Sequence, residues 1–444
     1  MMSKSFKFLS AWLWLLSFTF STMAYATQFA DEGETMRLHW KTNLIPIAFS
    51  TSLTKQNPYI NRASDVLGAV EKSLETWEKA ANIKFQVSWT DKQTISPSGK
   101  SGDGVSLITI AQTPENLLLF GSDAKEVSAR TRIFFNRKGF ITEADIVLNP
   151  YEQFSTDGSI GTFDLQATLT HEIGHLLGLE HSTVTGATMH DYQAKNGVYN
   201  LSSFSPRTLG EDDLTGIRAL YGATASDEEC CGTIIGNLTL VNGKAAKDFQ
   251  VWAEDAKSGR VIAGVTSNTS GNFRIEGLHG GQYKIYTQDS GKKSEKSYAV
   301  ENIGEIEVTK GKTQHIIKKL KSSRKNFAVQ YVGFNGQISD LAVPINGGKS
   351  YLIYVGGQNL NSDNLTIGFN SPYLSATPKT LVNHDYGADI SVVSFEVKVA
   401  GEIPFGEYSF FLKNKDDESQ FAVGSLTVEA VDNPWNSHQL LEGK

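Results

Sequence analysis

The segment HEIGHLLGLEH, residues 171–181, holds three of the nine histidines of this 444-residue chain within eleven positions. Apolar residues at 165, 169, 173, 176 and 177 form one stripe and predict a helix, with Thr162 or Asp164 available as its cap. His171 and His175 lie one turn apart on a face that points away from this stripe. The segment therefore requires a globular fold that buries one side of a helix and presents two imidazoles on the other.

A third imidazole, His181, would lie about 15 Å along the axis from His171 if the helix continued. Gly178 stands between them, and glycine adopts the left-handed backbone that ends a helix without steric cost. A turn there predicts that His171, His175 and His181 bind one zinc ion, each nitrogen about 2 Å from the metal. Three protein ligands leave one position for water, whose pKa zinc lowers toward about 7. Glu172 projects beside the metal, where it can take a proton from that water and deliver it to a leaving amine.

Chance is a poor explanation for the whole pattern. The HExxH core alone arises often in amphipathic helices, whereas HExxHxxGxxH specifies five positions. At about one in twenty per position, its accidental appearance in a chain of this length is on the order of one in 10,000.

The full motif resembles the signature of the metzincin zinc endopeptidases, in which a methionine turn follows the third histidine. Met189 lies eight residues after His181, and Ser182 follows that histidine directly, as in the matrixin branch. The resemblance implies that Met189 forms an apolar floor beneath the metal without binding it; an ordinary core methionine is the alternative. It also implies a peptide substrate extended along an edge strand above the active-site helix, for which residues 129–135 are the candidate.

The chain departs from the matrixin pattern after the methionine and in its other histidines. Only His39 and His190 are available in this region for the family's second, structural zinc, so one zinc ion is expected. Asp191 and Gln193 stand where the family has Pro and Tyr. Tyr192 is therefore one position away from the family's Tyr, and it is either a wall of the cleft or a packed residue. The connection that follows is longer than usual, so the family's side-chain preference does not transfer.

Residues 27–222 combine helix and strand patterns. The run SDVLGAVEKSLETWEKAAN has Ser64 as a candidate cap and apolar residues at spacings of three and four. Runs such as LIPIAFS, IKFQVSW and FITEADIVLN predict strands. The expected catalytic domain is α+β and metzincin-like, with a twisted mixed sheet and long helices.

The rest of the chain shows strand patterns only. Residues 223–231 are small and acidic and predict a linker. Residues 232–320 and 326–430 contain short alternating strands with turns about every ten residues, which predicts two all-β sandwiches. Residues 321–325 are expected to link them, and 431–444 to form a tail. The first sandwich resembles the transthyretin-type domain of some carboxypeptidases (carboxypeptidase regulatory-like), and the second an immunoglobulin-like domain of bacterial surface and secreted proteins.

The first residues have the features of an export signal. Lys4 and Lys7 precede the apolar run FLSAWLWLLSFTF, and small residues at 24 and 26 form a cleavage pattern, so residues 1–26 are interpreted as a signal peptide. At about 15 residues the run is short for a membrane span, although a retained anchor is the alternative. A secreted protein, periplasmic or extracellular, with no membrane segment after processing is expected.

Charge and cysteine content narrow the functional classes. Removing residues 1–26 takes away two lysines and no acidic residue, which leaves 39 basic and 48 acidic residues and a formal charge of −9. This balance argues against a nucleic-acid partner. Cys230 and Cys231 are the only cysteines, so the chain is not a disulfide scaffold, and we assign the pair no function. Calcium is neither required nor excluded.

Together these features predict a secreted, single-zinc endopeptidase that acts on protein or peptide substrates. His171, His175 and His181 are the expected metal ligands, and Glu172 is the expected general base and then acid. The rival is a surface or matrix-binding protein whose sandwiches bind a cell-surface or matrix ligand; the intact motif disfavours it. Hydrolysis of a non-peptide substrate stays open, because zinc-activated water is not selective among carbonyls.

Overall fold

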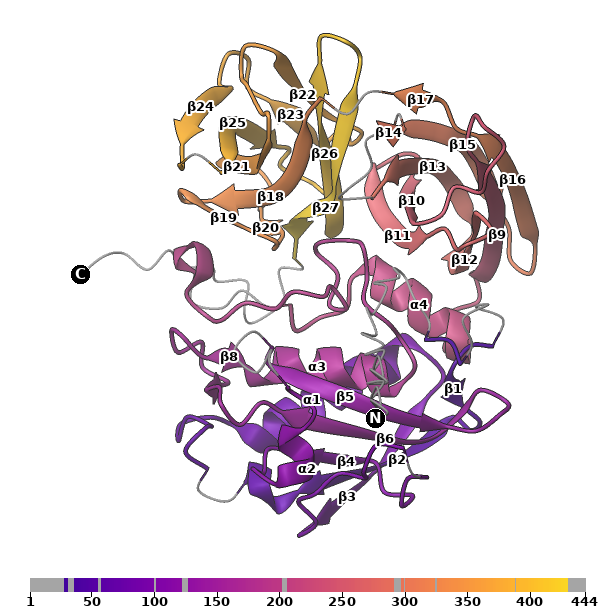
Figure 1. Cartoon of the computed structure of the whole chain (residues 1–444), viewed down its shortest axis with the longest axis vertical. Helices are drawn as coiled ribbons and strands as arrows, with labels where there is room; N and C mark the ends of the chain where they lie inside the picture. The colour runs from indigo at the N-terminus through magenta and orange to yellow at the C-terminus, as the bar shows by residue number, and fades with distance from the viewer. Residues whose placement is uncertain are drawn as a thin grey trace, which may run out of the picture.

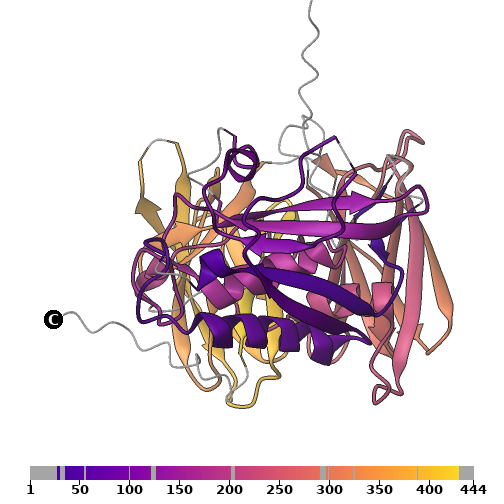
Figure 2. The ribbon, with the colours of Figure 1, turned by 90° about the horizontal axis from the view of Figure 1, so that it is seen from below.

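The computed structural model describes residues 28–429 apart from 31–35, 55–56, 100, 122–126, 202–205, 291–296, 299, 324–325 and 388. The expected signal peptide and C-terminal tail lie outside the described residues. We refer to the described residues up to 222 as the N-terminal unit, those in 223–323 as the middle β unit, and those in 326–429 as the C-terminal β unit. Figure 1 shows the N-terminal unit on one side of the molecule and both β units on the other. Figure 2 shows that the β units lie side by side behind it.

A six-stranded mixed sheet forms the floor of the N-terminal unit. Its strand order is β1-β6-β4-β2-β3, and each of these strands is parallel to its neighbours. Strands β1 and β4 pair with opposite ends of β6, and β5 pairs antiparallel along nearly the whole length of β6. Strand β5 is therefore an edge strand. The bounds are β1 (His39–Trp40), β2 (Leu44–Ser50), β3 (Lys84–Thr90), β4 (Leu107–Thr109), β5 (Ala129–Phe135) and β6 (Phe140–Leu148), with β7 (Phe154–Ser155) and β8 (Phe163–Asp164) pairing separately.

Four helices accompany this sheet: α1 (Val66–Ala80), α2 (Pro114–Leu117), α3 (Leu165–Leu176) and α4 (Glu211–Tyr221), with short 3-10 turns η1 (Thr51–Leu53) and η2 (Val198–Asn200). Helix α1 buries residues spaced three and four apart, as its sequence pattern predicts. Its cap is Asp65, which accepts a hydrogen bond from the Gly68 N–H; the expectation of Ser64 as cap was wrong by one residue. The Ser64 hydroxyl instead accepts from the Thr156 N–H, 3.2 Å away.

Helix α3 lies between the sheet and the β units (Figure 1). All of its twelve residues are buried, and the Asp164 carboxylate caps it by accepting from the Ala167 N–H at 2.9 Å. Trp77 of α1, which is fully buried, donates its indole N–H to the Thr170 carbonyl of α3. Helix α1 thus packs against α3 through Trp77. None of the helices in the described part of the chain is long and apolar enough to cross a bilayer.

Beyond α4 the described chain is built of strands, which confirms the expected all-β content. The middle β unit contains β9 (Cys230–Thr239), β10 (Phe249–Asp255), β11 (Arg260–Thr266), β12 (Asn272–His279), β13 (Gly281–Asp289), β14 (Ser297–Tyr298), β15 (Glu301–Val308), β16 (Thr313–Lys319) and β17 (Ser322–Ser323). The C-terminal β unit contains β18 (Ala328–Phe334), β19 (Gln337–Ser339), β20 (Val343–Pro344), β21 (Ser350–Gln358), β22 (Leu365–Phe369), β23 (Leu374–Ala376), β24 (Val382–Asp385), β25 (Ser391–Val399), β26 (Gly406–Asn414) and β27 (Ser419–Val428).

One sheet runs through both β units. Its order is β15-β13-β10-β11-β26-β27-β20, with β22 also paired to β26, so the junction is the antiparallel pair β11 and β26. The other sheets of these units are a three-stranded sheet β12-β9-β16, a two-stranded sheet β14-β17 and a six-stranded sheet β19-β18-β21-β25-β23, with β24 on β25. The domain boundaries expected from the sequence stay predictions. The eight-stranded sheet contains strands from both sides of the boundary expected at residues 321–325.

Candidate metal centre

The turn after α3 returns the chain toward the helix. Gly178 has φ +99°, and its N–H donates to the His175 carbonyl, while the Leu179 N–H donates to the Gly174 carbonyl. These two bonds form the Schellman pattern that ends helices at a left-handed residue. A Cβ atom on Gly178 would lie 2.3 Å from the Leu38 carbonyl oxygen, so the position excludes a side chain on steric grounds as well. The sequence-based expectation of a break at Gly178 is confirmed.

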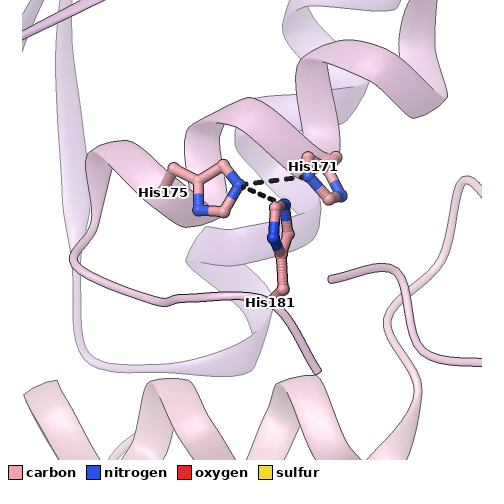
Figure 3. Close-up of side chains that lie close together, drawn as sticks. All are labelled: His171, His175 and His181. Atoms are coloured by element: carbon pink, nitrogen blue, oxygen red, sulfur yellow. Dashed lines mark hydrogen bonds between the residues drawn. The ribbon is translucent and has the colours of Figure 1, made fainter. Parts of the chain in front are cut away.

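The turn brings the three expected histidines together (Figure 3). Nε2 of His175 lies 3.1 Å from Nε2 of His171 and 3.2 Å from Nε2 of His181. His171 and His175 are buried, and His181 is partly exposed. Two nitrogen ligands of a tetrahedral zinc, each about 2.0–2.1 Å from the metal, stand about 3.3 Å apart. The spacing of the Nε2 atoms therefore fits a zinc ion.

The protonation of the imidazoles supports the same conclusion. Nδ1 of His171 lies 2.8 Å from the Thr188 carbonyl oxygen, and Nδ1 of His175 lies 2.9 Å from the Leu179 carbonyl oxygen. A carbonyl oxygen only accepts, so each Nδ1 carries the proton and each Nε2 offers a lone pair. Burial is the main cause that lowers the pKa of His171 to about 3, and the neighbouring His175 is the second cause. The His171 ring is therefore neutral. Burial also lowers the pKa of His181. Lone pairs that face one another at this distance suit a cation between them.

Glu172 lies next to this cluster and contacts the edge strand. Its Oε2 accepts a hydrogen bond from the Thr131 hydroxyl of β5. Burial raises the pKa of Glu172, partly offset by His175 and by the Thr131 hydroxyl. The carboxyl group is thus fixed between α3 and β5, with one oxygen oriented by Thr131. Sequence inspection did not single out Thr131, because only the pairing of β5 with β6 brings it over α3.

The Met189 side chain packs against α3. Its side chain is buried, and a Cβ atom on Gly174 would lie 2.3 Å from the Met189 sulfur. Gly174, the residue before His175, therefore leaves the space that the methionine fills. The role of Met189 as the floor of a metal site stays a prediction that this contact supports.

Two adjacent acids of α4, Asp212 and Asp213, hold the segment around Met189. Asp213 accepts from the Thr188 and Met189 N–H groups at 2.8 and 3.0 Å. Asp212 accepts from the Ser182 hydroxyl, one residue after His181, and from the Gly264 N–H of β11 at 2.6 Å. Burial raises the pKa of Asp212 to about 7 and that of Asp213 to about 6. Sequence analysis did not identify this role for either acid.

The remaining sequence candidates are not members of the histidine cluster. Tyr192 is 44% exposed and lines a cavity of about 240 Å³ between the N-terminal unit and the β units, so it does not pack in the core. Within the described residues, the metal-compatible groups are the histidine trio and a group at Asp227, Cys230 and His279. Cys230 is disulfide-bonded to Cys231, so its sulfur is not a free thiolate ligand. His39 and His190 belong to neither group.

Glu407 of β26 also lines that cavity, and its environment predicts a pH effect on stability. It is 6% exposed, and its Oε2 has no hydrogen-bond partner among the described residues. Burial, with the charges of Asp213 and Glu211, raises the pKa of Glu407 to about 8. The folded chain therefore keeps a proton that the unfolded chain loses as pH rises above about 4.5. Stability should fall with rising pH until the folded carboxyl ionises near pH 8, by at most about 1.4 kcal/mol per pH unit.

Glu407→Gln is expected to remove part of this pH dependence. In wild type the thermal midpoint should drop between pH 5 and pH 8.5, and in the variant this drop should be smaller. Some drop should remain in the variant, because the raised pKa values of Asp212 and Asp213 act in the same direction. Glu402→Gln, an exposed glutamate of the same β unit, is the matched control. Equal midpoint shifts in all three proteins would show that Glu407 does not titrate as described.

Comparison with known proteins places the family relationship on the N-terminal unit. The sequence profile of the matrixin family matches residues 122–222. A hatching enzyme of Paracentrotus lividus is 26% identical over 204 residues, which is 43% of this chain and 28% of that protein. Metalloendoproteinase 1-MMP of Arabidopsis thaliana is 28% identical over 196 residues, 41% of this chain and 44% of that protein. The chain thus spans less than half the length of either relative.

Among solved structures, the major pilin subunit of Bacillus cereus matches 43% of this chain and 66% of its own, at 16% identity and a TM-score of 0.19. A likeness at this level supports no conclusion about function. The family match, in contrast, covers the histidine motif, Met189 and helix α4. The resemblance expected from the motif is therefore confirmed: residues 122–222 match the matrixin family, whose members are zinc-dependent metallopeptidases.

Proposed function

We propose that the chain is a secreted zinc endopeptidase that hydrolyses peptide bonds of extracellular proteins. The observation that carries the proposal is the convergence of three imidazole Nε2 atoms, with the Glu172 carboxyl group fixed beside them under an edge strand. His171, His175 and His181 would hold one Zn²⁺. Zinc bound there would lower the pKa of a water molecule toward about 7 and polarise a carbonyl group.

Glu172 is the proposed general base and then general acid. Its carboxylate accepts a proton from the attacking water and later delivers it to the nitrogen of the leaving amine. The raised pKa that burial gives this carboxyl favours the first transfer, because a carboxylate of higher pKa is a stronger base. The Thr131 hydroxyl, which donates to Oε2, keeps the carboxyl group oriented between the two transfers.

Strand β5 is the proposed binding edge for the substrate backbone. Its described residues pair with β6 on one side, and Thr131 connects its middle to Glu172. An extended peptide added to the free side would form backbone hydrogen bonds whose strength does not depend on its side chains. A peptide bound there would have a peptide bond near Glu172, while other surfaces would set the side-chain preference.

A chelator-sensitive digest of a peptide library tests this proposal. The full chain is expected to cleave internal peptide bonds, to stop when a zinc chelator is added, and to recover when zinc is returned. Mass-spectrometric identification of the new termini would define the preference in the same experiment. Absence of cleavage, or cleavage that a chelator leaves unchanged, would contradict a zinc endopeptidase and favour the rival function in surface or matrix binding.

A further inference from the structure

Residues 183–187, between His181 and Met189, are held by both β units. The carbonyl of Thr183 accepts from the Gln250 side-chain amide of β10 at 2.9 Å, and the Thr185 N–H donates to the Val423 carbonyl of β27. Val184 and Ala187 are buried in one apolar cluster with side chains of both β units, namely Trp252, Val261 and Val423. Figure 1 shows loops of the N-terminal unit between α3 and the β units.

Tyr199, in the turn η2, is inserted into the C-terminal β unit. Its side chain is fully buried in that unit's core, and it shares this apolar cluster with Ala194 and Leu201. Its hydroxyl lies 3.0 and 3.2 Å from the carbonyl oxygens of Val332 and Leu341, to which it can donate, and 2.7 Å from the Ser339 hydroxyl. A buried tyrosine hydroxyl with such partners fixes its ring in one place.

The backbone at Tyr199 also depends on the C-terminal β unit. Tyr199 and Asn200 have φ values of +57° and +60°, a left-handed conformation that costs free energy for residues other than glycine. The Tyr199 N–H donates to the side chain of Gln337 at 2.7 Å, and the Asn335 side chain donates to the Tyr199 carbonyl at 2.8 Å. Contacts from β19 and its preceding turn therefore offset the cost of this conformation.

The residues that precede Tyr199, from Thr188 onward, contact the candidate metal centre. The Thr188 carbonyl oxygen accepts from Nδ1 of His171. The Gln193 side-chain oxygen accepts from the Ser128 hydroxyl, immediately before β5, at 2.7 Å. Ala194, the next residue, is already in the cluster that contains Tyr199. Few residues thus separate the metal ligand and the substrate edge from the anchor in the C-terminal β unit.

We propose that Tyr199 is a positioning residue, through which the C-terminal β unit holds residues 190–201 as one wall of the substrate cleft and sets the side-chain preference of cleavage. This inference rests on the proposed peptidase function. It assigns the β unit a part in the cleft itself, in place of a separate role as a spacer or targeting module. Tyr192 is exposed on the same segment, so it would be a wall residue of the cleft whose position depends on the buried anchor Tyr199.

The test compares Tyr199→Phe with Tyr408→Phe in the full chain. Tyr408 is equally buried in the same apolar cluster, and its hydroxyl donates to the Pro404 carbonyl within its own unit. Both variants lose a buried hydroxyl, but only Tyr199 belongs to the segment that reaches the metal centre. We expect Tyr199→Phe to raise KM about 3- to 10-fold, as loss of roughly one buried hydrogen bond implies, with kcat changed less than about twofold. Its peptide-library profile should broaden, and Tyr408→Phe should leave KM and the profile at wild-type values.

Hydrogen exchange of peptides covering residues 185–201 gives a readout that does not require activity. Exchange there should rise in Tyr199→Phe and stay at the wild-type level in Tyr408→Phe. If wild type cleaves peptides but the two variants share one KM and one cleavage profile, the inference is overturned while the proposed function stands. If wild type cleaves nothing, the proposed function fails, and equal exchange in both variants would overturn the anchoring role as well.

Discussion

Glu172→Gln is expected to lower kcat/KM by about 10²–10⁴-fold, the usual contribution of a general acid–base residue. Glutamine keeps the size of the side chain, and its amide oxygen can still accept from the Thr131 hydroxyl, so the geometry between α3 and β5 should survive. What the amide cannot do is take up and return a proton. Cleavage rates, together with the zinc content of purified protein, are the measurements.

Zinc content separates this role from a structural one. The variant should bind as much zinc as wild type, because Glu172 is not among the proposed ligands. Glu75→Gln, an exposed glutamate on α1, is a suitable control and should be fully active. Wild-type activity in Glu172→Gln would refute the proposed role, and joint loss of zinc and activity would show that the carboxylate builds the metal site instead.

His175→Ala is expected to abolish both metal retention and cleavage. The Nε2 atom of His175 is within 3.2 Å of Nε2 of both other histidines, so its loss leaves two imidazoles that can no longer enclose a zinc ion from three sides. After dialysis the wild type should retain one zinc per chain and the variant almost none. Inductively coupled plasma mass spectrometry, run in parallel with the peptide digest, measures both.

His39→Ala is the matched control for this experiment. His39 is another histidine of the N-terminal unit, on β1, with Nδ1 3.2 Å from the Arg37 carbonyl oxygen and no part in the cluster. It should keep its zinc and its activity. Zinc retained at wild-type level by His175→Ala would contradict the three-histidine site, and two tightly held zinc ions in wild type would contradict the expectation of one.

Local patterns predicted the elements around the site well. The break at Gly178 followed from the geometry of a continuous helix, since only a left-handed residue returns His181 to α3, and the structure has that residue at φ +99°. The one-residue error at the cap of α1 arose because Ser64 and Asp65 both favour caps. Sequence alone does not decide between adjacent capping residues.

The residues that support the site were harder to predict, because their roles depend on contacts between distant segments. Asp212 and Asp213 have the pattern of solvent-exposed acids in the first turn of a helix, yet both are buried against the Met189 segment. Tyr199 lies in a polar stretch with no periodic pattern, and its anchor in the C-terminal β unit joins residues more than 130 positions apart in sequence. Neither propensity nor motif spacing reports such a contact.

The pairing of β11 with β26 limits how this protein can be divided. Arg260 and Val261 are in register with Tyr408 and Glu407, so a chain shortened after residue 320 would leave β11 with backbone groups that have lost their partners. Open strand edges of this kind recruit other chains and promote aggregation. The middle and C-terminal β units are therefore expected to unfold together, and an insertion or a recombination event between them would have to preserve this strand pairing.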